Sequence, residues 1–270
     1  MYYIASCSCG KDSLAMVLRL MEENRPLDEI VFYDTGMEFQ AIYTIAEKLK
    51  ALAESKGIVF TTLYPPYDFL YMAFEKPIKS RKDGSIRYGQ SWCGGSCRWG
   101  TFQKLQVLNR YAKQKNAQVY VGIAADETKR LEAKLTPFNL FPLVEWQMTE
   151  QDCLDYSLSH GWNWLEGDVD LYSILDRVSC WCCANKNRKE LKNIYRYLPE
   201  YWQKLKDFQS KTSRPMKKYY RNGVPYGTVP EMEEVFKEEL EIENHCGAHL
   251  DSGENAIAER WELTATLKKN

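Results

Sequence analysis

The segment Ser8-Cys9-Gly10-Lys11-Asp12-Ser13 follows a short apolar run, Tyr2 to Ala5, and precedes the amphipathic stretch from Leu14 to Met21. This order predicts a strand, a tight loop of small residues and the first turn of a helix. The N–H groups at a helix N-terminus and the positive end of the helix dipole bind phosphate groups. Lys11 adds a positive charge, and the two serines add hydroxyl groups. The segment therefore predicts a phosphate-binding loop, with an ordinary strand-to-helix turn as the alternative.

Strand and helix signals alternate along the first half of the chain. The strand candidates are Glu29 to Tyr33, Ile58 to Leu63 and Val119 to Ile123, and the helix candidates are Ala41 to Ser55 and Phe102 to Lys113. Glycine and polar residues collect where the strands end. The alternation predicts an α/β fold, an open and mainly parallel sheet flanked by helices, which binds its ligand beyond the carboxyl ends of the strands.

Helical patterns dominate after Thr149, where Thr149 and Asp152 resemble a capping box. We expect residues 1–150 to form the α/β domain and residues 151–270 to form a helix-rich C-terminal region that packs on it. Residues 76–100 are expected to form a long irregular loop rich in lysine and arginine, and such loops are more often functional or mobile than idle. The basic and aromatic segment from Lys186 to Lys206 favours amphipathic helices over a nucleic-acid track.

Composition limits the class of protein. The chain has 270 residues, of which 44% are hydrophobic and 27% are charged, as in ordinary globular proteins. A formal net charge of -1 disfavours nucleic-acid coating by bulk charge but allows a local basic patch. We expect a cytoplasmic protein without a membrane partner, because no leader is recognised and no apolar run reaches roughly 18 residues. Nine cysteines in a reducing compartment indicate metal binding or catalysis.

Four cysteines have spacings that suit a metal. Cys180 and Cys183 form a Cys-x-x-Cys pair, and Cys93 and Cys97 are the natural complement. Four sulfur atoms complete a tetrahedral zinc site or hold the corners of a [4Fe-4S] cluster, and spacing alone does not decide between the two. Thiols without a metal are the remaining alternative.

Two further motifs follow predicted strands. They are Asp34-Thr35-Gly36-Met37-Glu38-Phe39 and Gly122-Ile123-Ala124-Ala125-Asp126-Glu127-Thr128-Lys129-Arg130. Each motif taken alone also has a purely structural interpretation, in which Asp34 caps a helix or Arg130 is a solvated surface charge. In a parallel sheet, however, both motifs lie at the edge that carries the phosphate-loop segment.

These motifs, in this order, resemble those of the phosphoadenosine phosphosulfate (PAPS) reductase family, which belongs to the PP-loop ATP pyrophosphatase, adenine nucleotide α-hydrolase-like superfamily. The loop is similar to the Ser-Gly-Gly-Lys-Asp-Ser pyrophosphate loop, with Cys9 in place of its first glycine. The resemblance also rests on Arg98-Trp99-x-Thr101-x-x-Lys104 and Pro142-Leu143-x-x-Trp146-x-x-Thr149-Glu150, and it covers about residues 3–205. The family often has cysteine where this chain has Gly100. Cys9 is expected to be strained if its φ is positive.

The resemblance implies that residues 1–150 bind ATP or a related adenine nucleotide, with Mg²⁺. The implied nucleotide-binding residues are Ser8, Gly10, Lys11, Asp12, Ser13, Asp34, Thr35, Gly36, Glu38 and Arg98. The candidate catalytic residues are Lys11, Asp12, Asp126 and Arg130, with Glu127 close to the reacting end. Asp34 and Asp126 are the candidates for electrostatic or Mg²⁺ support. We expect Lys11 to be an exposed cation. Cluster-bearing members of the family favour iron-sulfur at the cysteines, with zinc as the alternative.

The resemblance allows three functions. Members that keep Lys-Asp in the loop resemble enzymes that adenylate a substrate and release pyrophosphate, with sulfur transfer as a candidate further step. The segment His245-Cys246-Gly247-Ala248-His249 instead resembles the Glu-Cys-Gly-Leu-His signature of sulfonucleotide reductases, whose nucleophile would be Cys246. The third alternative is a nucleotide- or nucleic-acid-binding subunit of a DNA or RNA modification or defence complex. The acceptor substrate stays open in all three.

Overall fold

The computed structural model describes residues 1–95, 97–132 and 137–244. Five strands form one sheet in the order β3-β2-β1-β6-β7, and every neighbouring pair is parallel. The strands are β1 (Tyr2–Cys7), β2 (Glu29–Tyr33), β3 (Val59–Leu63), β6 (Ala117–Val121) and β7 (Asn139–Leu140). The predicted open parallel sheet is therefore confirmed. The chain adds β2 and β3 on one side of β1 and then β6 on the other, so the strand order reverses beside β1.

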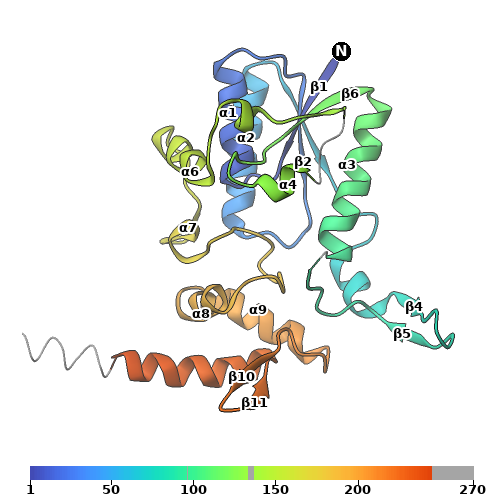
Figure 1. Cartoon of the computed structure of the whole chain (residues 1–270), viewed down its shortest axis with the longest axis vertical. Coiled ribbons are helices and arrows are strands. Elements are labelled where there is room, and N and C mark those ends of the chain that lie inside the picture. Colours follow the sequence, from blue (N-terminus) through green and yellow to red (C-terminus); the bar gives the residue numbers. More distant parts are fainter. Residues whose placement is uncertain (96, 133–136, 245–270) are drawn as a thin grey trace, which may run out of the picture. The chain divides into compact units, whose positions relative to one another are not determined.

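Helices cover both faces of this sheet. Figure 1 shows α1 (Lys11–Glu22) and α2 (Gln40–Ser55) on one side and α3 (Gln103–Gln114) on the other. All five residues of β2 are buried, as expected for a strand that is covered on both faces. On the α3 side, Ile4 and Val31 pack with Leu108 and Tyr111. Because the strands are parallel, the carboxyl ends of β1, β2 and β6 lie at one edge of the sheet.

The segment expected to be an irregular loop contains regular structure. Strands β4 (Pro77–Lys79) and β5 (Ile86–Tyr88) form an antiparallel hairpin between two π-helical turns, η1 (Tyr71–Glu75) and η2 (Arg98–Phe102). The hairpin was missed because each strand has only three residues, too few to show a periodic pattern. Backbone pairing and a tight turn hold it instead.

Several shorter elements complete the first part of the chain. They are α4 (Thr128–Glu132), α5 (Pro142–Glu145), α6 (Glu150–Ser159), β8 (Leu165–Glu166), β9 (Val169–Asp170), α7 (Leu171–Ile174) and α8 (Arg188–Tyr197). The capping box predicted at Thr149 is present at the start of α6, where the Asp152 backbone N–H donates to the Thr149 side chain and the Thr149 backbone N–H donates to Asp152.

The chain divides into two compact units between Leu198 and Pro199, not after residue 150 as expected. The segment 151–198 belongs to the first unit for a physical reason. Helix α6 packs against α1, and the Trp164 indole N–H donates to the carbonyl oxygen of Cys9 at 2.7 Å. The phosphate-loop segment is thus held from both sides by one unit.

The second unit is described over residues 199–244. It contains α9 (Pro199–Ser210), a hairpin of β10 (Tyr219–Arg221) and β11 (Val224–Tyr226), and a helix over residues 229–244. Trp202 and Phe236 pack in its core, with ring centroids 5.8 Å apart. Helices therefore account for the basic and aromatic segment 186–206, as predicted. Among the described residues, no helix is long and apolar enough to cross a membrane.

Candidate functional site

The phosphate-loop segment lies at the reversal of strand order, where sheets of this kind bind ligands. β1 ends at Cys7, and α1 begins at Lys11. Gly122 follows the neighbouring strand β6, and a Cβ atom on Gly122 would lie only 2.8 Å from the Cα of Ser13. The glycine of the Gly-Ile motif therefore lets the end of β6 approach the first turn of α1.

The backbone of the loop is strained at Cys9. Its φ is +59°, in the left-handed region that favours glycine, as was expected if this cysteine replaces a glycine. The Cys9 side chain is buried, with its sulfur 4.0 Å from that of Cys7. Together with the bond from Trp164, this packing holds the loop in its strained form.

Serine hydroxyl groups close the loop. The backbone N–H of Ser8 donates to the Oγ of Ser13 at 3.1 Å, and the two hydroxyl oxygens are 3.1 Å apart. The Ser13 hydroxyl also donates to the carbonyl oxygen of Gly10 at 3.2 Å. Both serines therefore shape the loop itself, while Ser8 Oγ remains part of its polar lining.

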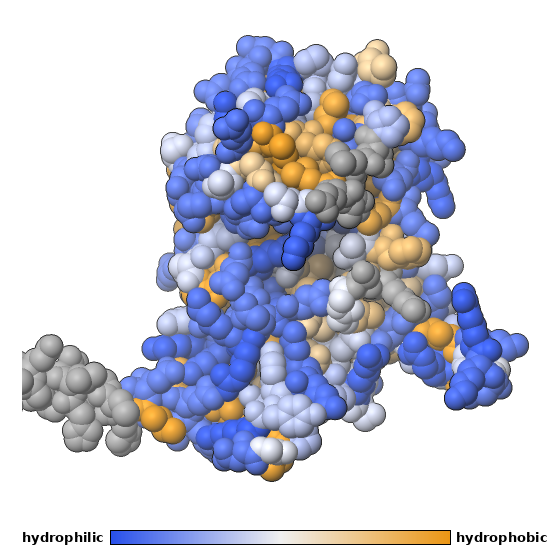
Figure 2. Space-filling model, viewed as in Figure 1, coloured by the Kyte–Doolittle hydropathy of each residue, from blue (hydrophilic) through white to orange (hydrophobic). Residues whose placement is uncertain are grey.

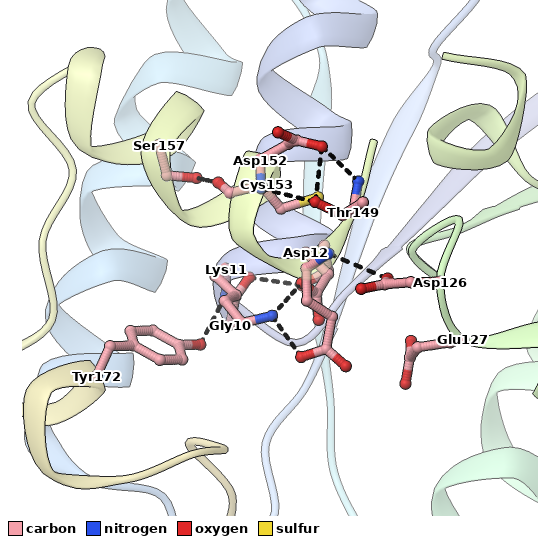
Figure 3. A network of polar contacts seen from close by, with 12 residues as sticks. Gly10, Lys11, Asp12, Asp126, Glu127, Thr149, Asp152, Cys153, Ser157 and Tyr172 are labelled. Atoms are coloured by element: carbon pink, nitrogen blue, oxygen red, sulfur yellow. Dashed lines mark hydrogen bonds and ion pairs between the residues drawn. The ribbon is translucent and has the colours of Figure 1, made fainter. Parts of the chain in front are cut away.

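Lys11 is buried, not exposed as expected; 7% of the residue is accessible. Its Nζ lies 2.7 Å from Oδ1 of Asp12 and 2.7 Å from Oε2 of Glu150 (Figure 3). Burial opposes the positive charge, but the hydrogen bonds to Asp12 and Glu150 outweigh it and raise the pKa of Lys11. Burial raises the pKa of Asp12 by more than Lys11 lowers it, with Glu150 adding to the rise. The ammonium group is therefore held charged between two carboxylates.

Two residues outside the predicted set contact this loop. Glu150, at the start of α6, binds Lys11, and the hydroxyl oxygen of Tyr172 accepts the backbone N–H of Lys11 at 2.8 Å. Tyr172 packs edge-on against Trp164, and burial raises the pKa of its phenol. Glu150 stood within a recognised motif, so its position was a usable signal. Nothing near Tyr172 in the sequence indicates its contact.

The motif from Gly122 to Arg130 contributes the carboxylate of Asp126 to the site and forms an ion pair between Glu127 and Arg130. Oδ1 of Asp126 accepts the backbone N–H of Glu150 at 3.1 Å, the bond drawn from Asp126 in Figure 3. Arg130 instead pairs with Glu127 within its own turn, with Nη1 2.6 Å from Oε2. The structure brings Asp126 to the loop and directs Arg130 to Glu127.

The motif after β2 is ordered by its own hydrogen bonds. Oδ1 of Asp34 accepts the N–H of Gly36 at 2.7 Å and the hydroxyl of Tyr43 at 2.9 Å. The Thr35 hydroxyl donates to Oε1 of Glu38 at 2.6 Å. Asp34 is thus fixed at the strand end beside the one that carries the phosphate loop.

This second motif also contacts one of the cysteine loops. The sulfur of Cys180 lies 3.5 Å from the Thr35 hydroxyl and 3.5 Å from Oε1 of Glu38, and the backbone N–H of Trp181 donates to the carbonyl oxygen of Met37 at 3.0 Å. Burial raises the pKa of the Cys180 thiol. The loop that carries Cys180 therefore lies beside the segment that follows β2, at the carboxyl ends of the strands.

The loop that carries Cys93 and Cys97 is hydrogen-bonded to the loop that carries Cys180 and Cys183 through the side chain of Asn185. The Asn185 side chain accepts the N–H of Gly95 at 2.7 Å and donates to the carbonyl oxygen of Gly95 at 2.8 Å. The sulfur of Cys97 accepts the N–H of Gly100, the residue that replaces the family's usual cysteine, at 3.2 Å. Within the described residues, no three side chains of His, Cys, Asp or Glu lie close enough together to hold one metal ion. The loops are adjacent, but their sulfur atoms are not gathered around one point.

A buried lysine lies next to the Cys180 loop. The Nζ of Lys186 donates to the Ser179 hydroxyl at 3.0 Å and lies 5.2 Å from the centre of the Phe39 ring. Burial lowers the pKa of Lys186, and the nearby Cys183 and Glu190 act in the opposite direction.

Two of the predicted site residues lie outside the part of the chain that the structure describes. They are Cys246 and the side chain of Arg98.

A parallel α/β sheet with a small-residue loop, a lysine and helix α1 at its point of reversal is an arrangement typical of α/β proteins that bind ligands at the carboxyl ends of their strands. The family model of the phosphoadenosine phosphosulfate reductase domain matches residues 2–166. The chain belongs to this family.

Individual relatives are more distant. An uncharacterised protein of Methanocaldococcus jannaschii is 26% identical over 207 residues, which make up 73% of this chain and 39% of that protein. The chain thus spans about two fifths of the length of this relative. Among solved structures, the U34-tRNA thiolase NcsA from Methanococcus maripaludis with its [4Fe-4S] cluster is 13% identical, with a TM-score of 0.42 over 89% of this chain and 72% of that chain.

Proposed function

We propose that this protein binds ATP or a related adenine nucleotide and acts at its α-phosphate, adenylating an acceptor and releasing pyrophosphate. One observation carries the proposal: a buried, charged lysine is held at the first turn of α1, at the strand reversal. A loop that only connected β1 to α1 would gain nothing from a buried cation, because burying a charge costs free energy.

Carboxylates outnumber Lys11 at this loop, so a phosphate can bind there only if a carboxylate moves away or Mg²⁺ neutralises the excess negative charge. Nζ of Lys11 contacts the carboxylates of Asp12 and Glu150, and the carboxylate of Asp126 accepts the backbone N–H of Glu150. The side chain of Glu150 is 44% exposed, so it can turn toward solvent when a phosphate approaches. Lys11 would then exchange Glu150 for a phosphate oxygen, while α1 supplies backbone N–H groups and its dipole.

These groups match the demand of the reaction. When the bond between the α- and β-phosphates breaks, negative charge develops on the leaving pyrophosphate. Once Glu150 has moved away, Lys11 and the N-terminus of α1 stabilise that charge with no change in the loop backbone, which Ser13 and Trp164 already order. The acceptor oxygen must approach the α-phosphate from the opposite side, in line with the leaving group.

The carboxylates of this site fit Mg²⁺. This ion is commonly held by one or two carboxylates together with substrate phosphates, and it would neutralise phosphate charge. Asp12 and Asp126 are the residues best placed to hold it, since both lie at the loop and their oxygen atoms are hard ligands. Asp34 is less available, because two groups, the N–H of Gly36 and the hydroxyl of Tyr43, donate to its Oδ1, whereas one donor each is recorded for Oδ1 of Asp12 and of Asp126.

The two cysteine loops fit a shared metal centre in donor chemistry and in their link through Asn185. Cys93, Cys97, Cys180 and Cys183 would hold it. Zinc there would be structural, whereas an iron-sulfur cluster would supply electron transfer or bind sulfur. The contact of Cys180 with Thr35 and Glu38 supports a role beside the nucleotide site.

Pyrophosphate release from ATP by the full chain tests the proposal. Either an alanine or a methionine at position 11 leaves the carboxylates of Asp12 and Glu150 without their cation. Because Lys11 is buried, alanine would also leave a cavity, so Lys11→Met, which keeps the aliphatic stem, is the better variant. We expect its ATP affinity to fall about ten- to hundred-fold, the value of a charge-assisted contact, and its turnover to be lost. Lys11→Arg should retain part of the binding.

The matched control is Lys50→Met, which removes an exposed lysine of α2 and should change nothing. Unchanged ATP binding and turnover in folded Lys11→Met would refute the phosphate site. Sulfite release from adenylylsulfate or its 3′-phosphorylated form by the wild type, abolished in Cys246→Ser, would favour the reductase alternative over adenylation.

A further inference from the structure

The hairpin of β4 and β5 is strongly basic. Residues 76–88 carry five basic side chains and one acidic side chain, a net charge of +4 in a chain whose total is -1. The basic residues are Lys76, Lys79, Arg81, Lys82 and Arg87. Figure 1 shows the hairpin projecting from the end of α3, and Figure 2 shows a mainly hydrophilic surface over it. Positive charge is therefore concentrated on one thin projection.

Carboxylates do not neutralise this charge. Asp83, the acid at the tip, accepts the N–H of Ser85 at 3.1 Å and its hydroxyl at 2.7 Å. Hydrogen bonds from Ser80 and Ser85 lower the pKa of Asp83 to about 2, so Asp83 serves the turn. In the part of the chain that the structure describes, no ion pair involves Lys79, Arg81 or Lys82. Their charges face solvent.

Exposed rings accompany the cations. Tyr88 on β5 is 70% exposed, and Tyr64 and Tyr67, in the segment before η1, are 64% and 50% exposed. The Nζ of Lys76 lies 4.9 Å from the centre of the Tyr67 ring. All three residues of β5 are exposed, so the Tyr88 ring is accessible to a partner.

The root of the hairpin is fixed. The N–H of Gly89 donates to the carbonyl oxygen of Lys76 at 2.9 Å, and that of Gln90 donates to Met72 at 3.0 Å. Gly89 has a φ of +69°, and a Cβ atom there would lie 1.9 Å from the carbonyl oxygen of Ala73. The hairpin is thus an ordered platform that continues into the Cys93 loop.

Cations interleaved with exposed rings match single-stranded nucleic acid, in which phosphates alternate with unpaired bases. Basic grooves follow the backbone, and aromatic rings stack on bases of any sequence. An acidic protein surface would use the charges but not the rings. We propose that the β4–β5 hairpin, with Tyr64 and Tyr67, is a binding surface for single-stranded nucleic acid. This goes beyond the nucleotide chemistry proposed above and does not depend on it.

Fluorescence anisotropy with the full chain tests the surface, using a labelled single-stranded RNA of about 20 nucleotides, longer than one stacking site. The triple variant Lys79→Glu, Arg81→Glu, Lys82→Glu should bind roughly ten-fold or more weakly. If these three side chains contact phosphates, the slope of log affinity against log salt should also become shallower by about 2. The hairpin lacks a buried face, so the variant should fold normally.

Two comparisons separate this mode from general charge effects. Lys50→Glu, Lys56→Glu, Lys113→Glu makes the same charge change at exposed positions elsewhere and should leave binding near the wild-type level. Tyr88→Ala should weaken binding about five-fold or more with an unchanged salt slope, because stacking does not release counterions.

Equal loss in the two triple variants, or wild-type affinity in the hairpin variant, would overturn the proposal. Tighter binding to vesicles of phosphatidylserine than to the RNA would also overturn it, in favour of a lipid surface. Single-stranded DNA of the same sequence distinguishes the two kinds of strand: equal affinity means backbone and stacking recognition, and weaker affinity for DNA means that the ribose hydroxyl contributes. Either result supports the hairpin as the docking surface.

Discussion

Lys11 owes its charged state to its two carboxylate partners. A lysine buried without partners would lose its proton, whereas Asp12 and Glu150 keep this ammonium group charged. The partners differ in access, since 24% of the Asp12 side chain and 44% of the Glu150 side chain are exposed. We therefore regard Asp12 as the lasting partner of Lys11 and Glu150 as the one that an incoming phosphate displaces.

This assignment gives a directional prediction for Glu150→Gln. Removing the negative charge of Glu150 eliminates a competitor for Lys11 and a charge that repels phosphate. We expect the affinity for ATP, measured by calorimetry, to rise about three- to ten-fold. This is the size of effect expected when Lys11 no longer has to give up a charged hydrogen bond to Glu150 in order to bind phosphate. Asp155→Asn removes a carboxylate from the same helix, where Asp155 accepts from Gln151, and should leave the affinity unchanged. Weaker binding in Glu150→Gln would mean that Glu150 itself holds the ligand or its metal.

At the scale of elements, the site depends on how closely β6 approaches α1. Gly122 permits that approach, because a methyl group would fall within 2.8 Å of the Ser13 backbone. Overpacking of this kind typically costs about 1–3 kcal/mol and is relieved by moving one element away from the other. The element that moves would carry Asp126 away from the loop.

We therefore expect Gly122→Ala to lose both stability and ATP affinity, as measured by chemical denaturation and calorimetry. Gly161→Ala is the matched control. Gly161 has a φ of +72°, and no atom lies within 4 Å of the site where its Cβ would be built, so strain lowers stability without altering the loop. If the two variants lose the same stability and Gly122→Ala still binds ATP normally, the packing of β6 on α1 is not part of the binding site.

For the whole molecule, the distribution of cysteines leads to a prediction about metal content. Cys93 and Cys97 lie far in sequence from Cys180 and Cys183, and Asn185 joins their loops in the fold. Protein purified without oxygen should be brown and contain iron and sulfide, or be colourless with about one zinc per chain. Cys97→Ser, Cys180→Ser and Cys183→Ser should each lose the metal, and Asn185→Ala should lower its content.

Two variants control for general effects on the protein. Cys153→Ser changes a buried thiol of α6, and Asn109→Ala changes an exposed asparagine of α3, so both should retain the metal. Neither iron nor zinc in wild-type protein, or equal loss of metal in Cys153→Ser, would show that the four cysteines are ordinary thiols.

Much of the α/β architecture could be predicted because local patterns encode it. The apolar run at Glu29–Tyr33 and the helical periodicity before Ser55 each correspond to one element in the fold. The phosphate-loop segment could be predicted equally well, because its strand, small residues, lysine and helix are consecutive in the sequence. The β4–β5 hairpin was not predicted, because each of its strands has only three residues and their pairing is carried by the backbone.

The sequence by itself determined the order of strands and helices, the position of the loop and the residues at each strand end. Only the tertiary structure decided that Lys11 is buried, that Glu150 and Tyr172 contact it, and that Asn185 joins the cysteine loops. The tertiary structure also decided that the segment up to Leu198 belongs with the sheet. The physical reason is distance along the chain: periodicity and capping act over a few residues, whereas the partners of Lys11 at Glu150 and Tyr172 are 139 and 161 residues away.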